Sequence, residues 1–157
     1  MTNISDLVTV ERVAHDARAS SKKRALELLS RLITNSHAGL SEQEVFESLV
    51  ARERLGATGL GRGVAIPHGR LKNLSRPIGA FMRLSQGVDY DASDKQPVDL
   101  LFALLVPEKS TEEHLQILST LAQMFSDKPF REQLRGTDSN SNVHDLLVHW
   151  QPHTPPP

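Results

Sequence analysis

The chain has 157 residues, a net charge of −1 from 18 basic and 19 acidic side chains, and no cysteine. This length favours one domain whose core needs no disulfide or structural metal. The lack of thiols excludes Cys-ligated zinc, iron–sulfur clusters and thiol catalysis, and the balanced charge argues against general nucleic-acid binding.

The first residues lack the basic start and apolar run of a signal peptide. The longest apolar stretch, 98–107, is too short to span a bilayer. We therefore expect a cytoplasmic protein that does not insert into a membrane.

Short strands and helices mix along the chain. Apolar periodicity predicts strands over 13–19, 64–66, 78–84 and 98–106, the last apolar enough to be buried on both faces. Capping residues and apolar stripes predict helices from Ser20 or Ser21 to Asn35, from Ser41 to Gly56, from Ser110 to Phe125, and over 128–134 and 142–150. The short basic run 22–24 fits a solvated helix face.

Together these elements predict an α/β fold, a three-layer α/β/α sandwich with a central mixed sheet. We expect one domain over 1–150, and a disordered tail over 151–157, which holds four prolines in seven residues. The stretch 86–96 is predicted to be a polar loop or hairpin.

His68 stands out among the seven histidines by its surroundings. A glycine-rich loop, 56–63, leads into the short apolar strand, which delivers the histidine to a predicted break at Pro67 and Gly69. A side chain at a strand end is held by a rigid scaffold and open to a partner. The alternative is a turn histidine without a role.

The glycine-rich loop could bring backbone N–H groups to an anion. It follows a helix and precedes a strand, whereas dinucleotide and P-loop motifs have the opposite order. A nucleotide site of either type is therefore not expected, and a loop that shapes the surroundings of His68 remains possible.

Arg52, in the last turn before the loop, could neutralise a bound phosphate or only complement the helix dipole. Arg54, Arg62 and Arg70 compete for the phosphate role, and spacing does not decide among them.

His114 shares a helix face with leucines and Phe125, so we expect it to point inward, near the helix start. A lone histidine on an apolar stripe is, however, more often a satisfied core residue than a functional one.

We expect the remaining histidines to lie on the surface. His144, His149 and His153 are spaced by five and four residues, which builds no strong ligand set, so we expect no metal and no cofactor.

A neutral imidazole is a good nitrogen nucleophile near pH 7, and its phosphorylated form can pass the phosphoryl group on. That chemistry suits His68 if another protein delivers the phosphoryl group.

Three regions of the chain carry a family resemblance. The residues 52–69, with Arg52-Glu53-Arg54-Leu55-Gly56, Thr58-Gly59 and Val64 to Gly69, resemble the active-site region of IIA proteins of the mannitol/fructose/nitrogen-regulatory family of the bacterial phosphotransferase system. The strand 97–107 and His114-Leu115 are similar to that family's central strand and second histidine. The helix start 21–26 matches the nitrogen-regulatory branch.

The resemblance implies a phosphotransferase component that carries phosphate on Nε2 of His68. It implies that Arg52 and His114 lie in the active centre, with Thr58 and Gly59 beside it. It also implies that the phosphate comes from an HPr-like phosphocarrier of the nitrogen branch. The output would be phosphorylation-dependent binding to regulatory targets, such as kinases or potassium transporters.

Two other functions stay open. A sugar-specific IIA component would pass phosphate to a separate IIB domain. A binding module with this fold would transfer none, although such a module would not need a histidine at position 68.

Overall fold

The structure, a computed structural model, describes residues 3–37, 39–110 and 112–152. The helices are α1 (Ile4–Leu7), the 3-10 turn η1 (Val10–Arg12), α2 (Lys22–Asn35), α3 (Glu42–Leu55), α4 (Glu112–Ser126), α5 (Lys128–Arg135) and α6 (Asn140–His149). The strands are β1 (Val13–Ala17), β2 (Gly59–Gly61), β3 (Val64–Ala65), β4 (His68–Leu71), β5 (Ile78–Val88) and β6 (Val98–Pro107).

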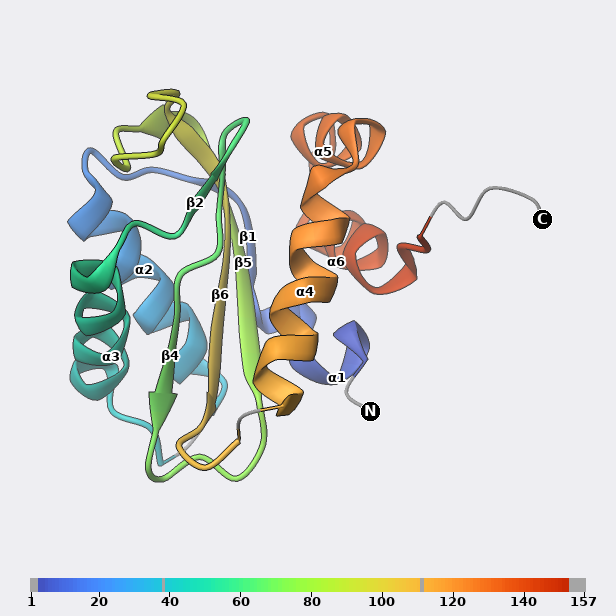
Figure 1. Cartoon of the computed structure of the whole chain (residues 1–157). Coiled ribbons are helices and arrows are strands. Elements are labelled where there is room, and N and C mark those ends of the chain that lie inside the picture. Colours follow the sequence, from blue (N-terminus) through green and yellow to red (C-terminus); the bar gives the residue numbers. More distant parts are fainter. Residues whose placement is uncertain (1–2, 38, 111, 153–157) are drawn as a thin grey trace.

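The strands form one mixed sheet in the order β1-β5-β6-β3-β2, and β4 also pairs with β6. β5 and β6 are antiparallel, whereas β3 and β4 run parallel to β6. Helices α2 and α3 cover one face, and α1, α4, α5 and α6 cover the other (Figure 1). The predicted three-layer α/β/α sandwich is confirmed.

Strand β6 shows how the two cores arise from one apolar stretch. Successive side chains of a strand point to opposite faces. Leu101, Ala103 and Leu105 accordingly join the cluster under α2 and α3, whereas the intervening residues Leu100, Phe102, Leu104 and Val106 join the cluster under α4 to α6. The predicted burial of this strand on both faces is confirmed.

Capping residues determine where most of the helices begin. The Ser21 and Ser41 side chains accept from the backbone N–H groups of Arg24 and Glu44. Ser139 caps α6 in the same way, which explains why that helix begins two residues before the predicted position. The start of α4 adjoins residue 111, which lies outside the described residues.

The predicted break in the strand is present at residues 66–67, between β3 and β4. The tight bend predicted at Gly69 is wrong, because His68 opens strand β4 and pairs with Leu104 of β6. Gly69 serves a different purpose, because a Cβ there would collide with the side chain of Ser48 on α3. The glycine lets α3 lie close against β4.

The glycine-rich loop is partly strand. Gly61, Arg62 and Gly63 all have positive φ, between 58° and 89°, and form the turn of a hairpin that joins β2 to β3. Strand β5 extends to Val88, farther than predicted. Of the predicted disordered tail, residues 153–157 lie outside the described residues. Within the described part, no helix has both the length and the apolar character to cross a membrane.

Candidate active site

His68 lies at the start of β4 with its ring held at both nitrogens. Nδ1 lies 2.8 Å from the carbonyl oxygen of Ile66. A carbonyl oxygen only accepts, so the proton of the neutral ring sits on Nδ1 and the lone pair sits on Nε2. The ring is thereby fixed in one tautomer, with Nε2 as its nucleophilic atom.

Arg52 reaches that atom from the last turn of α3. Its Nε–H donates to Nε2 of His68 at 3.1 Å, and its Nη1 donates to the carbonyl oxygen of Gly56 at 2.8 Å. The guanidinium is planar and rigid, so these two bonds fix both its position and its orientation. A positive charge therefore lies against the nucleophilic nitrogen.

The three competing arginines are placed differently. Arg54 is exposed on α3, and Arg62 lies in the β2–β3 turn, where its N–H donates to Asp94. Arg70 lies two residues beyond His68 on β4 and lines the groove described below. The structure thus selects Arg52 as the arginine in contact with His68.

The pKa of His68 is lowered. Burial is the largest cause, because it disfavours the charged ring, and the positive charge of Arg52 acts in the same direction. The hydrogen bond to Ile66 and the negative charge of Glu53 oppose the shift without cancelling it. The ring is therefore neutral near pH 7, the state in which Nε2 is a nucleophile.

His114, in the first turn of α4, points inward as predicted and is only 7% exposed. Its ring lies edge-on to that of His68, with ring centroids 5.4 Å apart and planes at 74°. Neither ring nitrogen finds a hydrogen-bond partner among the described residues. Buried polar atoms are rarely left unpaired, so this ring is poised to bind a group that arrives from outside.

The pKa of His114 is lowered to about 4. Burial is the main cause, and the nearby charges of His68, Arg70 and Arg52 add to it. At pH 7 the ring is neutral and offers one N–H donor and one acceptor.

An open groove of 890 Å³ exposes this cluster between α3, β4 and the start of α4. Its wall includes Arg52, His68 and His114. Leu55, at the end of α3, also lines it and is 84% exposed. His68 therefore borders a surface that is open to a partner protein.

Behind Arg52 lies a buried polar network that the sequence reasoning missed. Glu53, with a side chain 5% exposed, pairs with Lys22 at 2.9 Å and accepts from the hydroxyl of Tyr90 at 2.9 Å. Tyr90 is fully buried, and burial, followed by the charge of Glu53, raises its pKa. Tyr90 lies in the predicted polar loop 86–96, where the only signal was that it is the chain's single tyrosine.

Thr58 belongs to this network. Its hydroxyl donates to Glu53 and lies 3.2 Å from the Tyr90 hydroxyl, and its backbone carbonyl accepts from the N–H of Ile66. Gly59 follows in β2, where a Cβ would press against Ala92 at 3.1 Å. Both residues sit beside the cluster, and the hydroxyl of Thr58 is directed toward Glu53.

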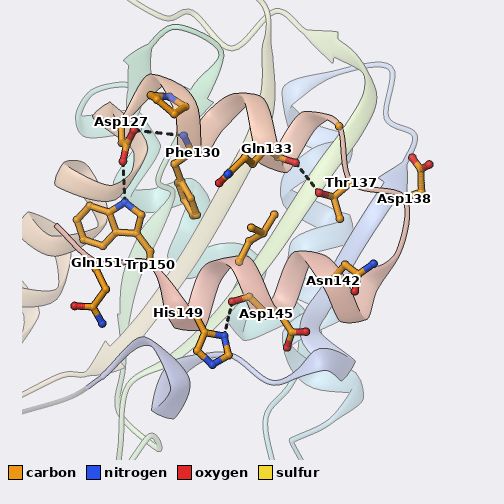
Figure 2. A pocket seen from close by; sticks show the side chains of 13 residues that line it. Asp127, Phe130, Gln133, Thr137, Asp138, Asn142, Asp145, His149, Trp150 and Gln151 are labelled. Atoms are coloured by element: carbon orange, nitrogen blue, oxygen red, sulfur yellow. Dashed lines mark hydrogen bonds between the residues drawn. The ribbon is translucent and has the colours of Figure 1, made fainter. Parts of the chain in front are cut away.

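A second cavity, of 1020 Å³, lies between α5 and α6 (Figure 2). Asp127 accepts there from the Trp150 indole N–H at 3.1 Å, and Thr137 donates to the carbonyl of Gln133. His149 binds the carbonyl of Asp145 in its own helix. These hydrogen bonds link groups of the cavity wall to one another.

The other C-terminal histidines are placed apart. His144 lies 3.1 Å from the carbonyl oxygen of Val8, which ties α6 to the N-terminal segment. His153 lies outside the described residues. Within the described residues, no group of three or more His, Asp or Glu side chains has the arrangement of a metal site.

Comparison with known proteins identifies the fold and the family. The family model "Phosphoenolpyruvate-dependent sugar phosphotransferase system, EIIA 2" matches residues 6–150. A nitrogen regulatory protein of Pseudomonas aeruginosa is 42% identical over 148 residues, which are 94% of this chain and 96% of that protein. A fructose-specific EIIA component of Haloferax volcanii is 35% identical over 94% of this chain and 96% of its own length.

The crystal structure of the nitrogen regulatory protein IIA-Ntr from Neisseria meningitidis superimposes with a TM-score of 0.86 at 45% identity. The match covers 92% of this chain and 98% of that one. The family resemblance inferred from residues 52–69 and 97–115 is thus confirmed over nearly the whole chain. The chain belongs to the type-2 EIIA family of the phosphoenolpyruvate-dependent sugar phosphotransferase system, and it is similar to the family's nitrogen regulatory proteins.

Proposed function

We propose that this chain accepts a phosphoryl group on Nε2 of His68 from an HPr-like phosphocarrier of the nitrogen branch. The observation that carries the proposal is the fixed tautomer of His68. Its proton is held on Nδ1 by Ile66, and its lone pair on Nε2 faces the groove wall beside Arg52.

The transfer balances without a metal, a cofactor or a proton acceptor. The lone pair on Nε2 attacks the phosphorus of the donor's phosphohistidine, and a new N–P bond forms. The donor's N–P bond breaks, and its electron pair returns to the donor nitrogen. The proton on Nδ1 of His68 stays in place and keeps its hydrogen bond to Ile66.

Arg52 and His114 are suited to hold the transferred group. Arg52 now donates to Nε2, so its guanidinium has to leave that atom and bind the arriving phosphoryl oxygens instead. An N–H of the neutral His114 ring, 5.4 Å away between centroids, is available as a second donor. Donors that bind the phosphoryl oxygens only on transfer favour the transition state over the free site.

The regulatory output follows from the added charge. A phosphorylated His68 replaces a neutral ring at the groove by a group of about −2 charge, which rejects one partner and recruits another. The similarity to nitrogen regulatory proteins supports a role in nitrogen regulation. We propose that the targets include kinases or potassium transporters and that the chain acts in the cytoplasm.

A sugar-specific role is the second candidate, favoured by the 35% identity to a fructose-specific EIIA component. In that role His68 would pass its phosphoryl group to a IIB domain. Incubation of the phosphorylated chain with isolated fructose- and mannitol-type IIB domains decides between the two. Loss of phosphate from this chain to a IIB domain would favour the sugar role.

The primary test is intact-mass analysis after incubation with phosphoenolpyruvate, the first enzyme of the relay and a nitrogen-branch phosphocarrier. We expect a gain of one acid-labile phosphate in the wild type and none in His68→Ala. A variant in the α5/α6 cavity, Asp145→Asn, should take up phosphate like the wild type. No uptake with any HPr-like donor would replace the proposal by that of a binding module.

A further inference from the structure

Glu53 follows Arg52 in the sequence but points away from the groove, into the buried network. One carboxylate oxygen, Oε2, accepts from the backbone N–H of Thr58 at 3.2 Å and pairs with Lys22. The other, Oε1, accepts from the hydroxyls of Thr58 and Tyr90. A buried carboxylate with this many partners holds them in one arrangement.

From Thr58 two further hydrogen bonds, joined through the backbone of Thr58 and Ile66, lead to the reactive ring. The Thr58 carbonyl accepts from the N–H of Ile66 at 3.1 Å. The carbonyl of Ile66 then accepts from Nδ1 of His68 at 2.8 Å. Three hydrogen bonds therefore connect Oε2 of Glu53 to the atom that determines the tautomer of His68.

The same short loop also holds Arg52. The carbonyl of Gly56 accepts from Nη1 of Arg52, and the N–H of Gly56 donates to the backbone carbonyl of Glu53. The loop 56–58 thus lies between the end of α3 and the Glu53 carboxylate. If that carboxylate no longer bound Thr58, both groups that hold the His68 ring would lose a fixed support: Arg52 at Nε2 and the Ile66 carbonyl at Nδ1.

We propose that Glu53 is a positioning residue for phosphoryl transfer. By binding the N–H of Thr58 it fixes this residue, whose own carbonyl orients Ile66. The Ile66 carbonyl in turn keeps the proton of His68 on Nδ1, so that Nε2 carries a lone pair and no proton. The inference rests on the proposed function for its consequence in transfer, whereas the tautomer itself exists in the unphosphorylated chain. Lys22 and Tyr90 hold the carboxylate in place and are not links of this chain.

Two substitutions distinguish the effect of the length of the Glu53 side chain from the effect of its charge. Glu53→Gln keeps the length: its amide oxygen can accept from Thr58 and Lys22, and its NH₂ can donate to the two hydroxyls. Glu53→Asp keeps the charge but withdraws the carboxylate by one methylene, too far for the Thr58 N–H. Tyr90→Phe is the matched control, because it removes one hydrogen bond to the same carboxylate without touching the chain to His68.

The measurement is the ¹⁵N chemical shift pair of the His68 ring in the unphosphorylated protein, assigned with His68→Ala. We expect the Nδ1–H tautomer in the wild type, in Glu53→Gln and in Tyr90→Phe. Glu53→Asp should raise the ratio of Nε2–H to Nδ1–H tautomer about fivefold, the effect of losing one ordinary hydrogen bond. The rate of phosphoryl uptake should fall in proportion to the population of the competent tautomer.

Each outcome decides the matter. Unchanged ring shifts in Glu53→Asp would overturn the proposal, as would a shift in Glu53→Gln or Tyr90→Phe as large as that in Glu53→Asp. The first result would make Glu53 a structural residue, and the second would point to general loosening or to charge. Because the shifts need no phosphate, a wild type that takes up none would refute the proposed function and leave this test intact.

Discussion

The groove at His68 and the cavity between α5 and α6 differ in a way that separates a reactive site from a space between helices. The α5/α6 cavity is the larger, at 1020 Å³ against 890 Å³, and it is lined by more acidic groups. Yet several of its polar groups bind one another, as Asp127 binds Trp150 (Figure 2). At the groove, His114 is buried with both ring nitrogens unpaired among the described residues. Unmet hydrogen-bonding capacity, rather than volume, marks the reactive region.

The largest effect should come from Arg52. Arg52→Ala removes the cation that faces Nε2 of His68, and we expect phosphoryl uptake to slow about 100-fold, typical for the loss of one donor to a transition state. Rapid-quench measurement of uptake checks this. Arg52→Lys should recover only part of the rate, since lysine lacks the rigid pair of donors that binds His68 and Gly56.

The control for this prediction is Arg54→Ala. It removes an exposed arginine that lies two residues after Arg52, in the same last turn of α3. It should react at nearly the wild-type rate. Equal losses in the two variants would mean that Arg52 acts only through net charge, and that the specific contact to His68 contributes nothing.

His114 should make the folded state sensitive to acid. Its pKa is about 4 in the folded chain and near 6.5 when exposed, so the unfolded chain binds more protons between these values. The free energy of unfolding therefore falls as the pH drops from about 6.5 toward 4, by about 2 kcal/mol at pH 4.5 from this group. This loss is absent well above pH 6.5, where the ring is neutral in both the folded and the unfolded chain.

Urea titrations at pH 7 and pH 4.5 measure this difference. In His114→Leu the fall in unfolding free energy between the two pH values should be smaller than in the wild type by about 2 kcal/mol. His149→Gln, at an exposed position on α6, should keep the wild-type pH dependence. An unchanged fall in His114→Leu would show that His114 is not the buried neutral group described above.

The smallest effect belongs to the α5/α6 cavity. Asp127→Ala removes the cap of α5 and the acceptor of the Trp150 indole, so the free energy of unfolding should fall by about 1 kcal/mol. Phosphoryl uptake of the folded protein should stay at the wild-type rate. A marked loss of phosphoryl uptake in a variant of unchanged stability would contradict this distinction between the groove and the cavity, and would connect the cavity to the reaction.

Much of the fold could be predicted because its signals are local. The apolar run 98–106 specified a doubly buried strand, and Ser21, Ser41 and Gly56 marked helix ends by capping chemistry alone. Strand β4 was missed because its pairing depends on β6, some 35 residues away in sequence. Pro67 and Gly69 signalled a break, whereas Gly69 is needed for the close approach of α3.

The candidate site, like the fold, was predictable where its signals are local and not where they depend on tertiary packing. The local sequence pattern made His68, Arg52 and His114 candidates, and the family resemblance assigned them to one active centre. The structure places all three within one cluster. Spacing could not choose among four arginines, because that choice depends on which helix end faces β4. Lys22 and Tyr90 were out of reach of sequence reasoning, since only tertiary packing brings them to Glu53.

The central claim is that Nε2 of His68 is the atom that carries phosphate. Long-range ¹H–¹⁵N correlation of the phosphorylated protein, with ¹⁵N-labelled histidine, tests it directly. We predict a single phosphorylated ring, that of His68, with phosphorus on Nε2 and the proton still on Nδ1. Phosphate on Nδ1 of His68, or on His114, would contradict the account.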